Sequence, residues 1–154
     1  MDIHLTIATE DDLDILIPFV RNYHDYEDIK ISDNESLKAL IKLLSDHNLG
    51  YIWLINRSQV TVGYIALCTG FSIEFGGFDA FVDEFFIDKA YRGQGIGSKV
   101  LQMVKKKSAE LGINSIHLEV ARSNEKAQAF YRKLGFQSRD KYFLMSLDVC
   151  HKNN

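Results

Sequence analysis

The clearest chemical feature of the sequence is an arginine followed by three alternating glycines, Arg92, Gly93, Gly95 and Gly97. A strand-like apolar run precedes this segment, and apolar residues at helical spacing follow it. The first N–H groups of a helix have no partner inside the helix, and the helix dipole adds partial positive charge there. Glycines leave room for an anion, and a guanidinium supplies forked donors. The segment therefore predicts a phosphate-binding loop.

Two common phosphate motifs do not match this loop. Residues 93–97 read G-x-G-x-G, one residue short of the dinucleotide fingerprint, and Ser98 and Lys99 follow Gly97 where a P-loop needs Lys and then Ser or Thr. The remaining pattern, R-x-x-G-x-G, resembles the acetyl-CoA pyrophosphate loop of the GNAT N-acetyltransferase superfamily. A purely structural strand-to-helix turn is the simpler alternative, and a binder of another nucleotide phosphate is a further one.

A second segment, residues 117–136, reads H-L-E-V-A-R-S-N-E-K-A-Q-A-F-Y-R-K-L-G-F. It resembles the other half of the GNAT site, in which two central strands splay apart and the pantetheine lies between them. The resemblance implies that acetyl-CoA, as co-substrate, is bound by Phe85, Phe86, Ile87, Arg92, Gly93, Gln94, Gly95, Ile96, Gly97, Ser98 and Asn124. It also puts Tyr131 at the family's general-acid position. A tyrosine, with an ordinary pKa of about 10, is protonated at neutral pH and can protonate a thiolate; the alternative is a core aromatic on an apolar stripe.

An acidic pair, Asp83 and Glu84, precedes the apolar run F-F-I. An alkyl ammonium must lose a proton before it can attack, and a carboxylate can accept that proton directly or through water. Neighbours on a strand point to opposite faces, so only one of the two is expected to face the substrate. The pair resembles the spermidine/spermine acetyltransferase branch, although that branch usually reads E-D. Glu84 is the preferred base over Asp83, whose alternative is a solvated face of the sheet.

The elements expected around these residues alternate between helices and strands. Strands are expected over 3–7, 51–55, 60–71, 78–87, 115–120, 136–138 and 142–147, and helices over 9–26, 33–47, 95–111 and 124–134. This order predicts an α/β (α+β) fold with a mixed, mostly antiparallel sheet and helices on both faces. It also matches the GNAT fold, as one domain over residues 1–154.

Composition limits the partners. A net charge of −3 and a pI of about 5.9 do not favour nucleic acid, and no apolar stretch approaches the ~20 residues of a membrane span. The N-terminus shows no secretory signal, and two cysteines form no spaced framework, so a cytoplasmic location is expected. Five histidines show no metal-ligand spacing, so no metal is expected. A homodimer is common among GNAT proteins.

The sequence thus predicts an enzyme, an acetyl-CoA-dependent N-acetyltransferase. It would move the acetyl group to a primary amine by direct attack in a ternary complex, because no activated nucleophile is evident. A small cationic amine, a polyamine or diamine, suits the acidic pair. A protein or peptide amine is the alternative acceptor, and a non-catalytic acetyl-CoA sensor is the alternative class.

Overall fold

The computed structural model describes residues 1–150, which fall into two compact units. The first unit is Met1–Glu119 and the second begins at Val120. The single domain expected over residues 1–154 stays a prediction.

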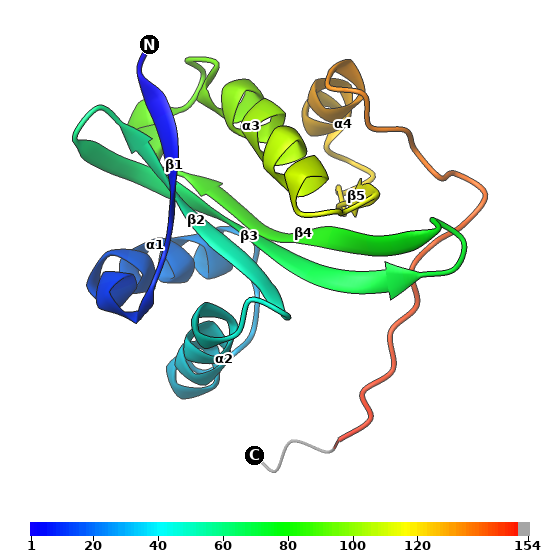
Figure 1. Cartoon of the computed structure of the whole chain (residues 1–154), viewed down its shortest axis with the longest axis horizontal. Helices are drawn as coiled ribbons and strands as arrows, with labels where there is room; N and C mark the ends of the chain where they lie inside the picture. Colours follow the sequence, from blue (N-terminus) through cyan, green and yellow to red (C-terminus); the bar gives the residue numbers. More distant parts are fainter. Residues whose placement is uncertain (151–154) are drawn as a thin grey trace. The chain divides into compact units, whose positions relative to one another are not determined.

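A five-stranded mixed sheet forms the centre of the first unit, with strand order β1-β2-β3-β4-β5 (Figure 1). Its first four strands are antiparallel neighbours, and β5 runs parallel to β4. The strands are β1 (Ile3–Ile7), β2 (Gly50–Arg57), β3 (Val60–Ser72), β4 (Gly77–Ile87) and β5 (Ser115–His117). The mostly antiparallel mixed sheet expected from the sequence is therefore confirmed, while β5 ends three residues earlier than expected.

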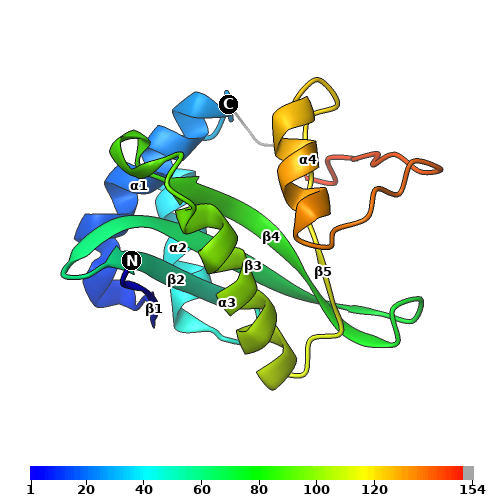
Figure 2. The ribbon, with the colours of Figure 1, turned by 90° about the horizontal axis from the view of Figure 1, so that it is seen from above.

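Helices cover both faces of this sheet. Helices α1 (Leu13–Tyr26) and α2 (Asp33–Ser45) lie on one face, and α3 (Ile96–Glu110) lies on the other (Figures 1 and 2). Capping side chains determine where α1 and α2 begin. Thr9 forms a capping box at the 3₁₀ turn Glu10–Asp12 that leads into α1, and Ser32 forms one at α2.

The core beneath α1 and α2 joins apolar residues of both helices to the sheet. Leu16 and Val20 of α1 and Leu40 and Leu44 of α2 pack in one buried cluster with residues of β2, β3 and β4. Tyr64 and Phe86, neighbours across β3 and β4, belong to this cluster. This packing holds the C-terminal half of β4 against α1, where the sequence predicts chemistry.

The second unit contains helix α4 (Glu125–Lys133), which Asn124 caps and which is followed by Gly135 at φ +99°. The strands expected over 136–138 and 142–147 are wrong, because the described residues 136–150 form no strand. The apolar residues of 142–147 are exposed instead, with Phe143 at 74% and Met145 at 81%. Apolar composition favours a strand, but a strand also needs a neighbour for its backbone hydrogen bonds, and composition does not supply one.

Candidate active site

The glycine-rich loop joins β4 to α3 through a short 3₁₀ turn, Lys89–Tyr91. Gly93 and Gly95 have φ of +73° and +80°, a left-handed conformation that other residues adopt only with strain. No atom lies within 4 Å of where a Cβ would stand at either glycine, so the space over the loop is open. Lys99 makes the first helical bond, to the carbonyl of Gly95, and the N–H groups of 96–98 precede it. This arrangement suits a phosphate group.

Arg92 is held against the sheet. Its Nε donates to the carbonyl of Ile87 at 2.7 Å, and its guanidinium carbon lies 5.4 Å from the ring centre of Tyr26 and 5.3 Å from that of Phe86. These contacts fix the cation at the start of the loop while its Nη groups have no recorded acceptor in the described chain. They also bring the end of α1 next to the loop.

A second cation next to the loop, Arg57 at the end of β2, was missed in the sequence. Its Nη1 donates to Oε1 of Gln94 at 2.7 Å, and Gln94 in turn donates to the carbonyl of Ala90 at 3.2 Å. Arg57 is 36 residues before Gly93, so no local spacing links the two.

β4 extends well beyond its pairing with β5, which ends at His117. β4 pairs with β5 only over Asp79–Phe81, yet β4 continues to Ile87. Beyond Phe81, β4 keeps its pairing with β3 and has no recorded β5 partner on the other edge. The main chain of Phe85–Ile87 is therefore on the part of β4 where the GNAT resemblance expects the pantetheine arm. That role stays a prediction.

A β-bulge interrupts β4 at the acidic pair. Ala66 of β3 pairs with Glu84 and the next residue, Leu67, pairs with Val82, so Asp83 is the extra residue. A bulge breaks the alternation of side chains and re-aims those next to it. The alternation behind the expectation that Asp83 and Glu84 point to opposite faces is interrupted here, and that expectation stays a prediction. Both carboxyls lie near enough to His24 of α1 for its charge to lower their pKa values.

Glu84 lies in a buried cluster with His24 and Tyr64. Oε1 of Glu84 accepts a hydrogen bond from the Tyr64 hydroxyl at 3.0 Å, and Oε2 is bonded to Nε2 of His24. The side chains of His24 and Glu84 are 14% and 16% exposed, and Tyr64 is fully buried. Three elements, α1, β3 and β4, thus converge on one carboxylate.

Burial dominates the protonation of this cluster. Loss of hydration raises the pKa of Glu84, and the hydrogen bonds from His24 and Tyr64 oppose this rise. Loss of hydration around the carboxyl also raises the pKa of Asp83, although the residue as a whole is exposed. The pKa of Tyr64 is raised by burial and by the charge of Glu84, so its hydroxyl stays a donor. Burial raises the pKa of the Cys68 thiol to about 11, which disfavours it as a nucleophile.

The remaining predicted residues, Asn124 and Tyr131, belong to the second unit. Asn124 Oδ1 accepts from the backbone N–H of Ala127 at 3.1 Å and so caps α4. The Tyr131 ring is half-buried, 5.1 Å from the ring of Phe130 and 5.6 Å from that of Phe136. Both the packing role and the acid role of Tyr131 are compatible with these contacts, and its acid role stays a prediction.

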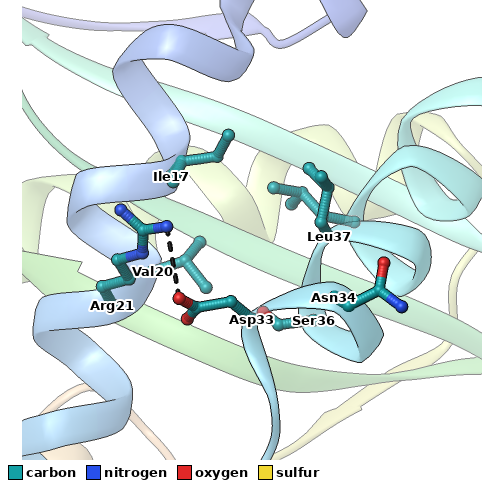
Figure 3. A pocket seen from close by; sticks show the side chains of 8 residues that line it. Ile17, Val20, Arg21, Asp33, Asn34, Ser36 and Leu37 are labelled. Carbon is teal, nitrogen blue, oxygen red and sulfur yellow. Dashed lines mark hydrogen bonds and ion pairs between the residues drawn. The ribbon is translucent and has the colours of Figure 1, made fainter.

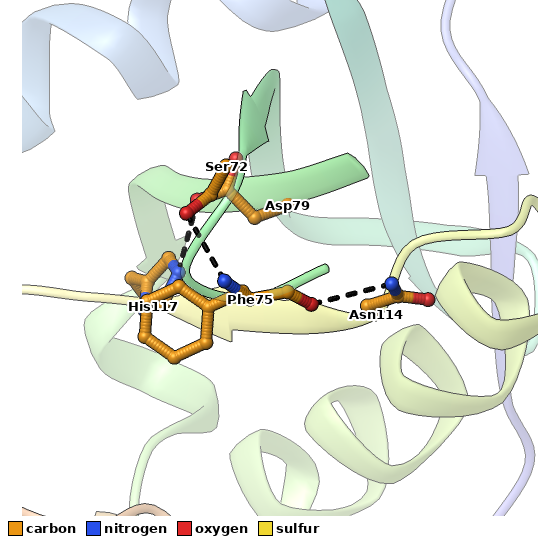
Figure 4. A network of polar contacts seen from close by, with 5 residues as sticks. All are labelled: Ser72, Phe75, Asp79, Asn114 and His117. Carbon is orange, nitrogen blue, oxygen red and sulfur yellow. Dashed lines mark hydrogen bonds and ion pairs between the residues drawn. The ribbon is translucent and has the colours of Figure 1, made fainter. Parts of the chain in front are cut away.

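A second polar network ties the turn before β4 to β5 (Figure 4). His117 Nε2 and Asp79 Oδ2 are 3.1 Å apart, and Asn114 donates to the carbonyls of Phe75 and Gly76 at 3.3 and 3.1 Å. The N–H of Phe75 donates to Ser72 Oγ. These bonds join neighbouring strands and their turn, so we assign the network a structural role.

A pocket of about 140 Å³ lies between α1 and α2 (Figure 3). Ile17, Val20, Leu37 and Leu40 give it an apolar lining, and an exposed ion pair between Arg21 and Asp33, at 3.4 Å, crosses it. None of the residues predicted for catalysis or cofactor binding lines this pocket. In the described part of the chain, no group of three or more His, Cys, Asp or Glu side chains is arranged to hold a metal ion. No helix within residues 1–150 is long and apolar enough to cross a membrane.

Residues 14–136 match the acetyltransferase (GNAT) family, which covers both halves of the predicted site. The chain belongs to this family. It is an acetyl-CoA-dependent N-acetyltransferase of the GNAT type, and the family resemblance, the fold and the enzyme class expected from the sequence are confirmed.

Relatives of this GNAT protein support the same class. An uncharacterised N-acetyltransferase of Archaeoglobus fulgidus is 28% identical over 126 residues, 80% of this chain and 86% of the relative. A probable spermine N(1)-acetyltransferase of Bacillus subtilis subsp. natto is 40% identical over 57 residues, only 36% of this chain and 38% of that protein. The crystal structure of a possible acetyltransferase from Clostridium difficile 630 has a TM-score of 0.82 at 25% identity, covering 97% of this chain and 99% of that one.

Proposed function

We propose that this GNAT enzyme acetylates a primary amine of a small cationic acceptor, a polyamine or diamine, by direct attack in a ternary complex. The observation that carries the proposal is that Asp83 and Glu84, at the bulge of β4, both lie near the imidazole of His24, in the same unit as the glycine-rich loop. Two carboxylates favour a cationic substrate through electrostatic attraction. The short stretch of similarity to a probable spermine N(1)-acetyltransferase points the same way.

The loop fits the co-substrate. Open space over Gly93 and Gly95, the N-terminal amides of α3 and two nearby guanidiniums, of Arg92 and Arg57, suit a pyrophosphate. We therefore assign pyrophosphate binding to residues 92–98. On the GNAT resemblance alone, we also assign the pantetheine arm to the main chain of 85–87 and a contact with the CoA chain to Asn124.

The proton balance defines the catalytic roles. An alkyl ammonium first loses one proton to the cluster around Glu84 and Asp83. The amine nitrogen then bonds to the acetyl carbon, the bond from that carbon to sulfur breaks, and the nitrogen gives up a second proton. Tyr131 protonates the leaving thiolate and is reprotonated at the expense of that second proton. One proton in total is released to solvent for each amide formed.

Release of free CoA thiol from acetyl-CoA tests the proposal, with a panel of polyamines, diamines, amino acids, aminoglycosides and short peptides. We expect thiol release that depends on the amine and is fastest with polyamines or diamines. Release with peptides alone would replace the acceptor by a protein amine. Binding of acetyl-CoA with no amine-dependent release would favour the sensor. The homodimer and the cytoplasmic location stay predictions.

A further inference from the structure

The partners of Glu84 raise the question of which atom of the cluster receives the proton. An ionised carboxylate only accepts hydrogen bonds. Both oxygens of Glu84 already have a hydrogen-bond partner. Oε1 accepts from the Tyr64 hydroxyl, and Oε2 is bonded to Nε2 of His24. Each oxygen of Glu84 is thus already bonded to a neighbouring side chain, and the Glu84 side chain is only 16% exposed. The carboxylate is thus better placed to hold a neighbour than to react.

That neighbour is His24, in the last turn of α1. With an ionised Glu84 at its Nε2, the neutral imidazole carries its proton on Nε2, and Nδ1 is left as the acceptor. Within residues 1–150, no hydrogen bond involves Nδ1 of His24. In that part of the chain the buried side-chain atoms without a partner are Trp53 Nε1 and Ser108 Oγ; Nδ1 of His24 is not among them, and the His24 side chain is 14% exposed.

The position of His24 suits an acceptor of a substrate proton. His24 is bonded to Glu84, which directly precedes residues 85–87, the stretch of β4 proposed to hold the pantetheine arm. The titratable groups that face His24 come from every neighbouring element: Glu84 and Asp83 from β4, Tyr64 from β3 through Glu84, and Tyr23 from α1, whose ring centre is 6.0 Å away.

We propose that Nδ1 of His24 is the general base that takes the first proton from the ammonium, with Glu84 as the positioning residue that orients the ring and Tyr64 as the donor that fixes Glu84. A general base whose orientation is fixed by another side chain is a common arrangement in enzymes that activate a nucleophile. The ring becomes an imidazolium, stabilised by Glu84, and returns the proton to solvent from Nδ1. This inference rests on the proposed function, because it assigns a step of that reaction.

His24→Gln tests the base, with His4→Gln as the matched control, since His4 is exposed on β1. The glutamine amide can still donate to Glu84 but cannot take a proton. We expect His24→Gln to lower kcat by about 100-fold or more, the usual contribution of a general base, with little change in the KM for acetyl-CoA. The acidic limb of the kcat profile against pH should disappear. His4→Gln should behave as the wild type.

Nitrogen NMR of ¹⁵N-histidine-labelled protein gives a readout independent of turnover. The signals of His24 should show a proton on Nε2 and none on Nδ1 at neutral pH, and Glu84→Gln should shift the proton toward Nδ1, because the amide can donate to Nε2. A proton on Nδ1 in the wild type would overturn the proposal. The proposal would also be overturned if the His24→Gln variant kept more than about a tenth of the wild-type kcat and still showed the acidic limb of the profile of kcat against pH. A wild type without any amine-dependent thiol release would instead refute the proposed function, and the base assignment with it.

Discussion

Tyr64→Phe isolates the hydrogen bond on which the geometry of the cluster depends. The Tyr64 side chain is fully buried, and its hydroxyl donates to Oε1 of Glu84 at 3.0 Å. Phenylalanine keeps the ring and its packing against Phe86, whose ring centre is 6.4 Å away. The variant therefore removes one donor and leaves the core volume nearly unchanged.

The expected loss follows from the charge and exposure of the acceptor. A hydrogen bond to a charged group contributes about 1.5–3 kcal/mol, and an unmet buried acceptor adds to the cost of losing it. Because the Glu84 side chain is 16% exposed, water can replace the hydroxyl in part. We expect the free energy of unfolding to fall by about 1–2 kcal/mol. For a chain of this size, each kcal/mol lowers Tm by roughly 2–4 °C.

The loss should depend on pH with a definite sign. Burial raises the folded-state pKa of Glu84, so this group stabilises the fold fully below its unfolded pKa, and that contribution is lost as pH rises through the folded value. The Tyr64 bond opposes the rise, so its removal raises the pKa further. The cost of Tyr64→Phe is therefore largest where Glu84 is ionised and shrinks as pH falls through the pKa of Glu84.

Urea unfolding followed by circular dichroism at neutral and mildly acidic pH measures this cost. Tyr51→Phe is the matched control, because Tyr51 is half-buried on β2 and its hydroxyl has no hydrogen bond within residues 1–150. A loss from Tyr64→Phe no larger than the loss from Tyr51→Phe would refute the reasoning. A loss of equal size at every pH would show that the hydroxyl does not act on a titrating carboxylate.

Three further outcomes are expected. Tyr131→Phe should lower kcat by roughly 100-fold while calorimetry shows unchanged acetyl-CoA affinity, and an unchanged kcat would leave Tyr131 a packing residue. Gly95→Ala should weaken acetyl-CoA binding and lower the free energy of unfolding in urea by about 1 kcal/mol. The cost comes from backbone strain at φ +80° and not from a clash, because the space around the new Cβ is open. An unchanged affinity for acetyl-CoA would contradict a role of Gly95 in phosphate binding. Asp83→Asn should raise the KM for a diamine more than the KM for acetyl-CoA. Because burial raises the pKa of Asp83, its ionised form costs stability at neutral pH, so any stability gained by the variant should appear at neutral pH and vanish in acid.

Local sequence chemistry was sufficient to predict most of the first unit. Capping residues, glycines with positive φ and apolar periodicity are short-range signals, and Ser32 at the start of α2 and Gly112 after α3 stand where they were expected. The strands expected over 136–138 and 142–147 failed because strand formation depends on a partner elsewhere in the chain.

The candidate site was predictable only where its residues are neighbours in sequence. The loop at 92–98 and the acidic pair are contiguous, so their chemistry could be inferred from spacing. The bulge at Asp83 was not predictable, because it is a mismatch of register with β3. A single misjudged residue of register reverses which face a side chain occupies. For this reason the division of labour between Asp83 and Glu84 could not be inferred from the strand pattern.

His24 carries no sequence signal at all, since it stands 60 residues before Glu84 and has no metal-like or triad-like spacing. Its significance comes from packing: α1 is pressed onto β3 and β4 by the apolar cluster that includes Leu16, Val20 and Phe86. That packing removes Glu84 from water, and a carboxylate removed from water needs donors. Tyr64 and His24 are the two that the fold provides. The same burial that makes Glu84 costly to ionise thus creates the oriented imidazole, and a base of this kind depends on the core beneath α1 as much as on the residues that touch the substrate.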